Sequence, residues 1–303
     1  MGEILKLAIT IDVEEEGLFG GAYPRSGATV SNVALLEKLE WLTRDFDLPL
    51  TLLVDHAVAS SGACATVLRH WKDDLGAEIG VHLHPWNTPP FGDGDPLDST
   101  AMPPELLSAK LGNVLEAVEA CVGGRPRSFR MGRWDFSESV RRAVLASGLL
   151  VDASVAPLKH TPAGTTWFNA PAEPFWLDEE HSVLEVPLTV LPIVPAFGRL
   201  AVNMGKSVTR RFSSFGALGI QPVWFPAWSM RQAVRLHAHR HGEVLNLFFH
   251  SSELLPGASP HFPTEQSVRN FLEKLRTFVV WLKRYVVVKG RTLSGLRQDM
   301  ESR

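Results

Sequence analysis

Two pairs of polar residues, each at the end of an apolar run, have a spacing that suits metal chemistry. Asp12 and Glu14 follow the first run, and His82 and His84 end a second one. Residues two apart on a strand point to the same side, so each pair presents its side chains together. Two imidazole nitrogens and one carboxylate can hold a zinc-like ion and leave a position for water. The other carboxylate can then act as a base. In the competing interpretation, the three consecutive glutamates that begin at Glu14 form a solvated acidic turn.

Three further side chains follow other apolar segments. His250 ends a continuous apolar run, and an imidazole there can donate a proton to a leaving amine because its ordinary pKa lies near neutral pH. Arg130 can orient a carboxylate through paired hydrogen bonds, and Trp134 offers a ring face to a sugar. The alternatives are a capping or core hydrogen bond for His250 and scaffold roles for Arg130 and Trp134.

Other clusters and other chemistries have less support. His237, His239 and His241 lie on a polar helical stretch, which we interpret as a solvated face. The sequence contains no phosphate-binding glycine motif after a strand and no G-x-S-x-G nucleophile motif. Neither Cys64 nor Cys121 has a histidine near it in sequence. Covalent catalysis and nucleotide binding through these motifs are therefore not indicated.

The candidate residues must be positioned by an alternation of β-prone and amphipathic segments, which is typical of βαβ architecture. Strands are expected over 5–11, 49–54, 78–84, 128–131, 149–153, 183–188 and 244–249, and helices over 33–42, 65–71, 104–122, 137–146, 229–241 and 264–285. Ser31 is expected to cap the first helix, Pro104 to start the third and Gly123 to follow its end. Periodicity is lost over 154–182.

About seven strands with intervening helices predict a parallel sheet, and the pattern alone does not separate a barrel from an open sheet. Both architectures gather functional side chains at the carboxyl ends of the strands, where the candidates fall. We expect one domain over 1–303, with a rim loop over 89–102 and an irregular insertion at about 192–228.

Charge and hydropathy narrow the possible partners. A formal net charge of -3 provides no basic field for nucleic acid, which we exclude as a partner. The N-terminus resembles no secretory signal, and no segment has the roughly 18 apolar residues of a membrane span. We therefore expect a cytoplasmic protein without a transmembrane segment. Residues 186–228 are apolar and poor in acids, which leaves peripheral membrane contact open as an alternative.

Five short motifs, in order, resemble the NodB-homology polysaccharide deacetylases, which are similar to carbohydrate esterase family four. They are Thr-Ile-Asp12-Val-Glu14, Glu-Ile-Gly-Val-His82-Leu-His84-Pro-Trp86, Phe-Arg130-Met-Gly-Arg-Trp134, Asp152-Ala-Ser and Phe-His250-Ser-Ser-Glu253. Each motif alone is weak, but five in order from residue 10 to about 257 are fairly specific. The last one resembles the branch found among surface-polysaccharide biosynthesis enzymes.

The resemblance implies a distorted (β/α)7 partial barrel and a metal-dependent hydrolase that removes an N-acetyl group from an amino sugar in a glycan or carrier-linked precursor. On that pattern Asp12 is the base, Arg130 positions it, and His250 is the acid. Glu14, His82 and His84 hold a divalent metal, Zn²⁺ by type. The substrate-binding candidates are Trp134, Asp152, Trp86 and Glu253.

Two departures from the family pattern keep other functions open. The family usually has an aspartate at the position of Glu14, and its second histidine stands four residues after the first, where this chain has Trp86. His84 is our substitute for that ligand. A metal-independent hydrolase of cyclic amides, as in the allantoinase-like relatives, is one alternative. A non-catalytic glycan-binding module that has lost a ligand is the other.

Overall fold

Seven parallel strands form the centre of the fold. The structure, a computed structural model, describes residues 4–21, 23–92 and 96–302. Within these residues the strands follow the order β10 (Val244–His250), β1 (Ile4–Val13), β2 (Leu50–Val54), β3 (Glu78–Leu83), β4 (Ser128–Met131), β5 (Val151–Asp152) and β7 (Leu184–Glu185). The short strand β6 (Phe175–Trp176) pairs antiparallel with β7, and β11 (Val287–Gly290) pairs parallel with the start of β1.

The sheet curls until its two ends meet at Asn246 on β10. The backbone N–H of Thr189, just after β7, donates to the carbonyl of Asn246 at 3.2 Å. In return, the Asn246 backbone N–H donates to the Thr189 hydroxyl at 2.8 Å, and its side-chain amide donates to the Val186 carbonyl at 2.9 Å. Only a few bonds close this side, so the sheet is a distorted partial barrel. The predicted fold class is confirmed.

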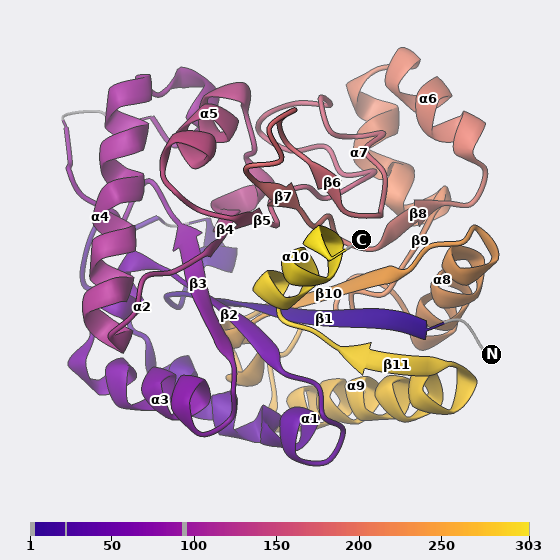
Figure 1. The fold of residues 1–303 in the computed structure, drawn as a ribbon, viewed down its shortest axis with the longest axis horizontal. Helices are drawn as coiled ribbons and strands as arrows, with labels where there is room; N and C mark the ends of the chain where they lie inside the picture. The colour runs from indigo at the N-terminus through magenta and orange to yellow at the C-terminus, as the bar shows by residue number, and fades with distance from the viewer. Residues whose placement is uncertain (1–3, 22, 93–95, 303) are drawn as a thin grey trace.

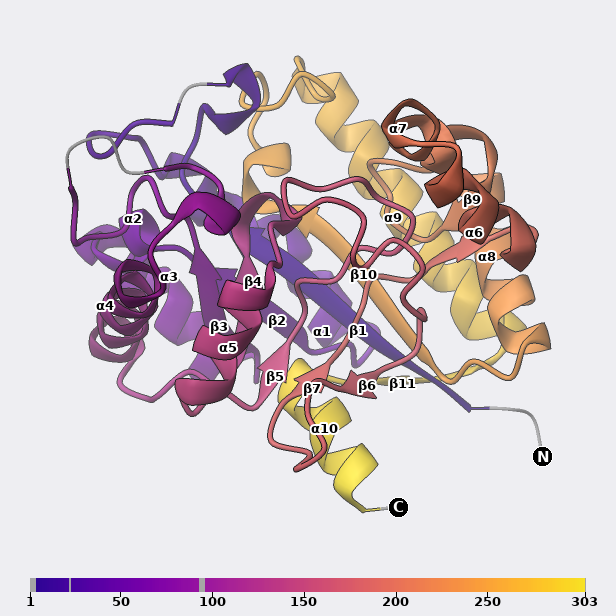
Figure 2. The same cartoon turned by 90° about the horizontal axis from the view of Figure 1, so that it is seen from above.

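Helices surround the curled sheet, most of them on its outside and α10 across one of its ends, as Figures 1 and 2 show. They are α1 (Glu40–Arg44), α2 (His56–Ala59), α3 (Gly62–Asp73), α4 (Pro104–Val122), α5 (Glu138–Ala146), α6 (Pro195–Asn203), α7 (Lys206–Phe215), α8 (Ala227–His239), α9 (Glu265–Tyr285) and α10 (Leu293–Glu301), with 3-10 turns η1 (Leu18–Gly20), η2 (Ser31–Leu39), η3 (Ser99–Ala101), η4 (Gly132–Trp134) and η5 (Ser251–Leu254). None of the helices among the described residues has the length and apolar character needed to cross a bilayer.

Local signals explain several helix boundaries. Pro104 occupies the first turn of α4, and Gly123 ends it with a left-handed φ of 70°. The hydroxyls of Ser137 and Thr264 accept hydrogen bonds from the first turns of α5 and α9. These three helices lie within one or two residues of their predicted positions.

Other predictions of local structure were wrong in whole or in part. The segment predicted as a helix over 33–42 is the 3-10 turn η2 followed by the short α1, and Ser31 does not cap it because its hydroxyl donates to Glu16. The insertion at 192–228 is ordered: α6 and α7 form a hairpin between the antiparallel strands β8 (Val190–Pro192) and β9 (Ala217–Gly219). His237 is buried and bonds the Val244 carbonyl, so it is not part of a solvated face.

The amino ends of the strands are closed by α10, which the sequence did not predict. Its Leu293 and Leu296 pack with Ala8 of β1 and Leu53 of β2 inside the curl. Of the predicted rim loop over 89–102, residues 93–95 lie outside the described part of the chain. The predicted single domain over 1–303 likewise includes residues 1–3, 22 and 303, which are not described.

Candidate active site

The candidate residues meet at the carboxyl ends of adjacent strands because the strand register aligns them. On β1 and β10, Asp12 is directly opposite His250. On β3 and β4, His82 is directly opposite Arg130. The regular parallel pairing of buried apolar strands therefore brings together four side chains that lie far apart in the sequence.

Glu14, His82 and His84 form a compact group of possible metal ligands. The Oε2 atom of Glu14 lies 3.4 Å from Nε2 of His82 and 3.3 Å from Nε2 of His84. All three side chains are buried, and their donor atoms lie within 4.8 Å of one another. Ligand atoms at about 2.0–2.1 Å from a tetrahedral ion are separated by roughly 3.3–3.4 Å, so this spacing suits Zn²⁺.

On both imidazoles, the nitrogen that faces away from Glu14 contacts another protein group, which is the usual arrangement for metal-binding histidines. Nδ1 of His82 lies 3.0 Å from the Arg130 carbonyl, and Nδ1 of His84 lies 2.9 Å from Oε2 of Glu15. Glu15 also accepts a hydrogen bond from the Trp86 indole N–H at 2.8 Å. These contacts direct both Nε2 atoms toward Glu14. The donor set therefore fits a divalent metal.

A second acidic group surrounds the other side of His84. Asp55 lies 3.5 Å from Nδ1 of His84, and its oxygens accept hydrogen bonds from the Val58 N–H and the Asn87 amide. Burial, aided by Glu15, raises the pKa of Asp55 to about 8. Because protein donors already occupy these oxygens, the group supports His84 and does not form a separate ion site.

The charges of the ligand cluster depend strongly on one another. Burial alone would raise the pKa of Glu14, but the neighbouring His250, His82 and His84 outweigh it and lower that pKa to about 2. Burial opposes protonation of His84, but the carboxylates around it raise the pKa of its imidazole well above the usual value. A bound cation would take the place of the proton on the His84 imidazole, so binding would release a proton.

Asp12 is held by a fully buried arginine. The Arg130 guanidinium donates to Oδ1 of Asp12 at 2.6 Å and to the Thr10 hydroxyl at 2.8 Å, and its Nε donates to the Ala153 carbonyl at 2.8 Å. The other oxygen of Asp12, Oδ2, lies 3.7 Å from Nε2 of His82. One carboxylate oxygen is thus fixed and the other faces the ligand cluster.

His250 is oriented by the residue that ends the same motif. Glu253 accepts the His250 backbone N–H at 3.0 Å, and its other oxygen lies 3.2 Å from Nδ1 of the imidazole. Burial lowers the pKa of His250, but Glu14 and Glu253 more than offset this and raise it to about 9. The ring is therefore an imidazolium at neutral pH, and Nε2 is left as the proton donor.

These groups share one pocket of about 240 Å³. Its lining consists of Asp12, Glu14, Leu18, Phe19, Tyr23, His82, His84, Trp86, Arg133, Trp134, Lys159, Trp224 and His250. Phe19 also lines a neighbouring groove of about 760 Å³ that extends between Gly17 and Gly257. The reactive pocket is thus small, and an open groove continues past it.

Two of the four predicted substrate-binding residues line the pocket in the structure, and the other two do not. Trp86 and Trp134 line the pocket, whereas Glu253 is 1% exposed and contacts His250. Asp152 is fully buried: it accepts from the Ser154 hydroxyl and lies beside Glu185 on β7. Glu253 therefore orients the histidine, and Asp152 belongs to the barrel interior beneath the pocket.

The turn after β4, which carries Trp134 into the pocket lining, has a strained backbone. Arg133 and Trp134 both adopt left-handed backbone angles, with φ of 58° and 59°. Such angles cost non-glycine residues about 1–3 kcal/mol each and are concentrated at functional sites. Gly132 is required beside them because a Cβ atom there would lie 2.5 Å from the His84 ring.

Lys159 is a site residue that the sequence did not indicate. Its ammonium lies 3.9 Å from the centre of the Trp224 ring and 5.5 Å from that of Trp134. Burial lowers the pKa of Lys159 to about 7, although the charge of Asp12 opposes that shift. Lys159 and Trp224 come from aperiodic segments, so no pattern could have placed them. Glu15 is fully buried, which rules out the competing interpretation of a solvated acidic turn at this residue.

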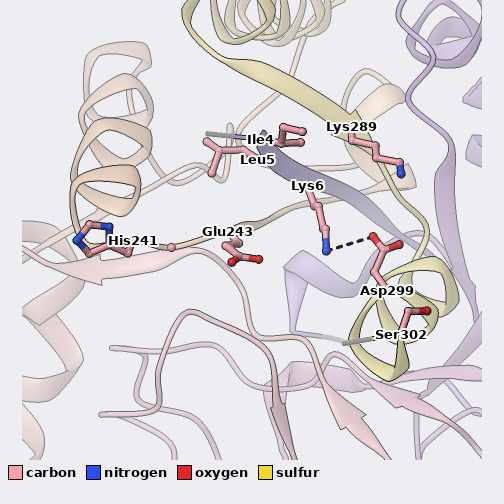
Figure 3. Close-up of a pocket in the computed structure, with 9 residues that line it drawn as sticks. Ile4, Leu5, Lys6, His241, Glu243, Lys289, Asp299 and Ser302 are labelled. Carbon is pink, nitrogen blue, oxygen red and sulfur yellow. Dashed lines mark ion pairs between the residues drawn. The ribbon is translucent and has the colours of Figure 1, made fainter. Parts of the chain in front are cut away.

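A second pocket, of about 610 Å³, lies at the opposite ends of the strands (Figure 3). Lys6 and Asp299 point toward each other across it and form an ion pair of 3.3 Å. This pair ties α10 to β1. The pocket is therefore part of the floor of the barrel, on the far side from Asp12.

Comparisons with known proteins support the fold. No protein-family model and no curated protein matches the chain. Among solved structures, a Mycobacterium smegmatis protein provisionally named a polysaccharide deacetylase has a TM-score of 0.59 and 17% identity, over 100% of this chain and 92% of its own. A Pseudomonas aeruginosa PAO1 protein with a similarly provisional name has a TM-score of 0.59 and 16% identity, over 98% and 89%. Puue allantoinase has a TM-score of 0.57 and 15% identity, over 96% and 88%. The chain therefore has the fold of the polysaccharide deacetylases, as its five motifs indicated.

Proposed function

We propose that the protein is a metal-dependent amide hydrolase that removes the N-acetyl group from an amino sugar in a glycan or glycan precursor. One observation carries this proposal. A carboxylate base, a fitting ligand trio and a protonated imidazole line the same small pocket. The structural neighbours named as polysaccharide deacetylases support it through their fold.

Each residue has a distinct task in this reaction. Glu14, His82 and His84 would hold the ion, Zn²⁺ by its ligand types, which when bound supplies Lewis-acid activation of the acetyl carbonyl. Asp12, fixed through one oxygen by Arg130, takes a proton from the attacking water with the other oxygen. His250 then donates its proton to the departing nitrogen, so that acetate and a free amine leave.

The pocket supports a substrate with a small reactive end and a larger remainder. About 240 Å³ accommodates an acetamido group with part of one sugar ring, against Trp134 and Trp86. The groove of about 760 Å³ beyond Phe19 offers room for a further sugar or a carrier. We propose a carrier-linked substrate in the cytoplasm, and a place in the surface-polysaccharide branch of the family.

The direct test measures acetate released from N-acetylhexosamines that are free, nucleotide-linked or lipid-linked, with added Zn²⁺. We expect turnover that Asp12→Asn and His250→Ala each reduce by about 10²–10⁴-fold, as for loss of a general base or acid. Asp299→Asn, on the floor of the barrel, is the matched control and should keep parental turnover. Acetate release that is unaffected by Asp12→Asn would refute the proposed base.

A cyclic amide hydrolase is the second candidate. The fold match to Puue allantoinase favours it, as does Trp86 at the position of the family's usual second histidine. Ring opening of a cyclic ureide by chelator-treated protein, without acetate release from any sugar, would replace the first proposal with this one.

A non-catalytic glycan-binding module makes a different prediction. Sugar binding would survive Asp12→Asn, and the parent protein would show no turnover with any of these substrates.

A further inference from the structure

The α6–α7 hairpin exposes large apolar side chains that the rest of the fold does not cover. Both helices lie at the periphery of the molecule in the two views (Figures 1 and 2). Six apolar side chains on these two helices and on the loop before α6 are 41–63% exposed, namely Ile193, Val194, Phe197, Leu200, Met204 and Phe215. They line a shallow groove of about 530 Å³. Contiguous apolar surface of this kind marks a contact site.

The hairpin is held firmly at its base. The Ile193 N–H donates to the Gly216 carbonyl at 2.9 Å, and the β8–β9 ladder continues below it. The guanidinium of Arg240, at the end of α8, donates to the carbonyls of Pro192 and Ile193 at 2.9 and 3.1 Å. The apolar surface is therefore presented on a fixed stem.

The charged residues of the hairpin and of the segment that carries it have a single sign. From residue 186 to residue 242 the sequence contains no Asp or Glu. Arg199 of α6 and Lys206, Arg210 and Arg211 of α7 are exposed. Their field reaches the loop below: burial lowers the pKa of His160, and Arg210 and Lys206 lower it further.

Charge decides which partner fits. A second copy docking through this face would place like charges opposite each other, because a two-fold interface repeats the same patch. Apolar side chains bordered only by cations are instead typical of elements that lie in the interface of an anionic bilayer. We propose that the α6–α7 hairpin docks the protein on the surface of a membrane that contains anionic lipids.

Docking here would also hold the pocket near the membrane. Gly198 of α6 packs against the loop that carries Lys159, since a Cβ atom at that glycine would lie 3.4 Å from the Leu158 side chain. Phe212 of α7 contacts Phe168 of the same loop, with ring centres 5.8 Å apart. Lipid binding does not depend on the proposed deacetylation, so the two are tested separately.

The test is sedimentation of the full chain with vesicles of phosphatidylcholine alone, or of phosphatidylcholine and phosphatidylglycerol in equal parts. We expect binding to the anionic vesicles only, weakened by salt. The charge variant Arg199→Gln/Lys206→Gln/Arg210→Gln/Arg211→Gln should lose roughly fivefold in partition for each cation removed. Arg269→Gln/Arg284→Gln on α9 is the matched control and should bind as the parent does.

The apolar variant Phe197→Ser/Leu200→Ser/Met204→Ser/Phe215→Ser should also fail to sediment, whereas Val287→Ser, an exposed apolar position on β11, should not change binding. Circular dichroism verifies that each variant is folded. Equal binding to both vesicle types, no binding to either, or unchanged binding of the charge and apolar variants would overturn the proposal. Self-association through the hairpin without vesicle binding would also overturn it and would assign the face to a protein contact.

Discussion

Replacing Arg130 with methionine tests how Asp12 is held. The guanidinium is fully buried against the rings of Trp134 and Phe248, at 4.9 and 5.1 Å from their centres. Methionine fills similar space but leaves the Asp12 carboxylate without its cation. Breaking a buried ion pair by removing one partner costs about 3–5 kcal/mol, because an uncompensated charge remains. We expect Arg130→Met to lower the free energy of unfolding by that amount.

The pairing itself is isolated by a double-mutant cycle. In an Asp12→Asn background no carboxylate remains at this position, so the same Arg130→Met change should cost about 2 kcal/mol less, within the range of coupling between contacting residues. Urea unfolding of chelator-treated protein measures all four forms and keeps metal binding out of the comparison. An Arg130→Met cost below about 1 kcal/mol, or an equal cost in both backgrounds, would refute the inferred role of Arg130.

Three further predictions concern metal and protons. Dialysed protein should retain close to one Zn²⁺ per chain, and free metal at about 100 times its Kd should raise the free energy of unfolding by about 2.7 kcal/mol. The variant His82→Ala/His84→Ala should abolish both effects. Metal retained by that variant would contradict the ligand set. In metal-free protein the His250 ring should titrate near pH 9 by NMR, and metal binding should lower this pKa because the ion neutralises the neighbouring Glu14 carboxylate. A pKa near 6.5 in the metal-free protein would show that the carboxylates do not act on His250. Burial raises the pKa of Asp152 to about 6 and that of Glu185 well above its usual value. These two carboxyl groups therefore hold more protons in the folded chain than in the unfolded chain, so their contribution to stability should fall as pH rises from about 4.5 through about 6. Glu185→Gln should flatten that slope in urea titrations, and an unchanged slope would argue against the pair.

The sequence predicted the strand ends well because burial there leaves a simple pattern. Continuous apolar runs indicated β1, β3 and β10, and the polar residue that ends each run was Asp12, His82 or His250. Parallel pairing then brings such ends to one edge whatever lies between them. That part of the site follows from local sequence and general topology.

The remaining parts depend on tertiary contacts. The alternation of a strand places Glu15 opposite Asp12 and Glu14, yet the chain leaves β1 at Val13 and Glu15 turns inward to bond His84. Lys159 has its position set by packing against Trp224, which no local pattern encodes.

The helices that were not predicted differ in how clearly their sequences indicate a helix. Helices α6 and α7 contain Gly, Ser, Thr and Val, which are poor helix formers, and they are stabilised by packing on each other, on β8 and β9 and on the loop that carries Leu158 and Phe168. A signal was present for α10, because Thr292 caps it and Leu293 and Leu296 share one face.

The position of His84 directly after β3 has an evolutionary consequence. His82 lies near the end of β3, His84 directly follows that strand and Glu14 follows β1, so the proposed ligand set depends on the ends of two central strands. The loop beyond Pro90 is then under no selection to hold the ion. A lineage with this histidine spacing can lengthen, shorten or exchange that loop, and so acquire new substrates, while its metal chemistry is inherited unchanged.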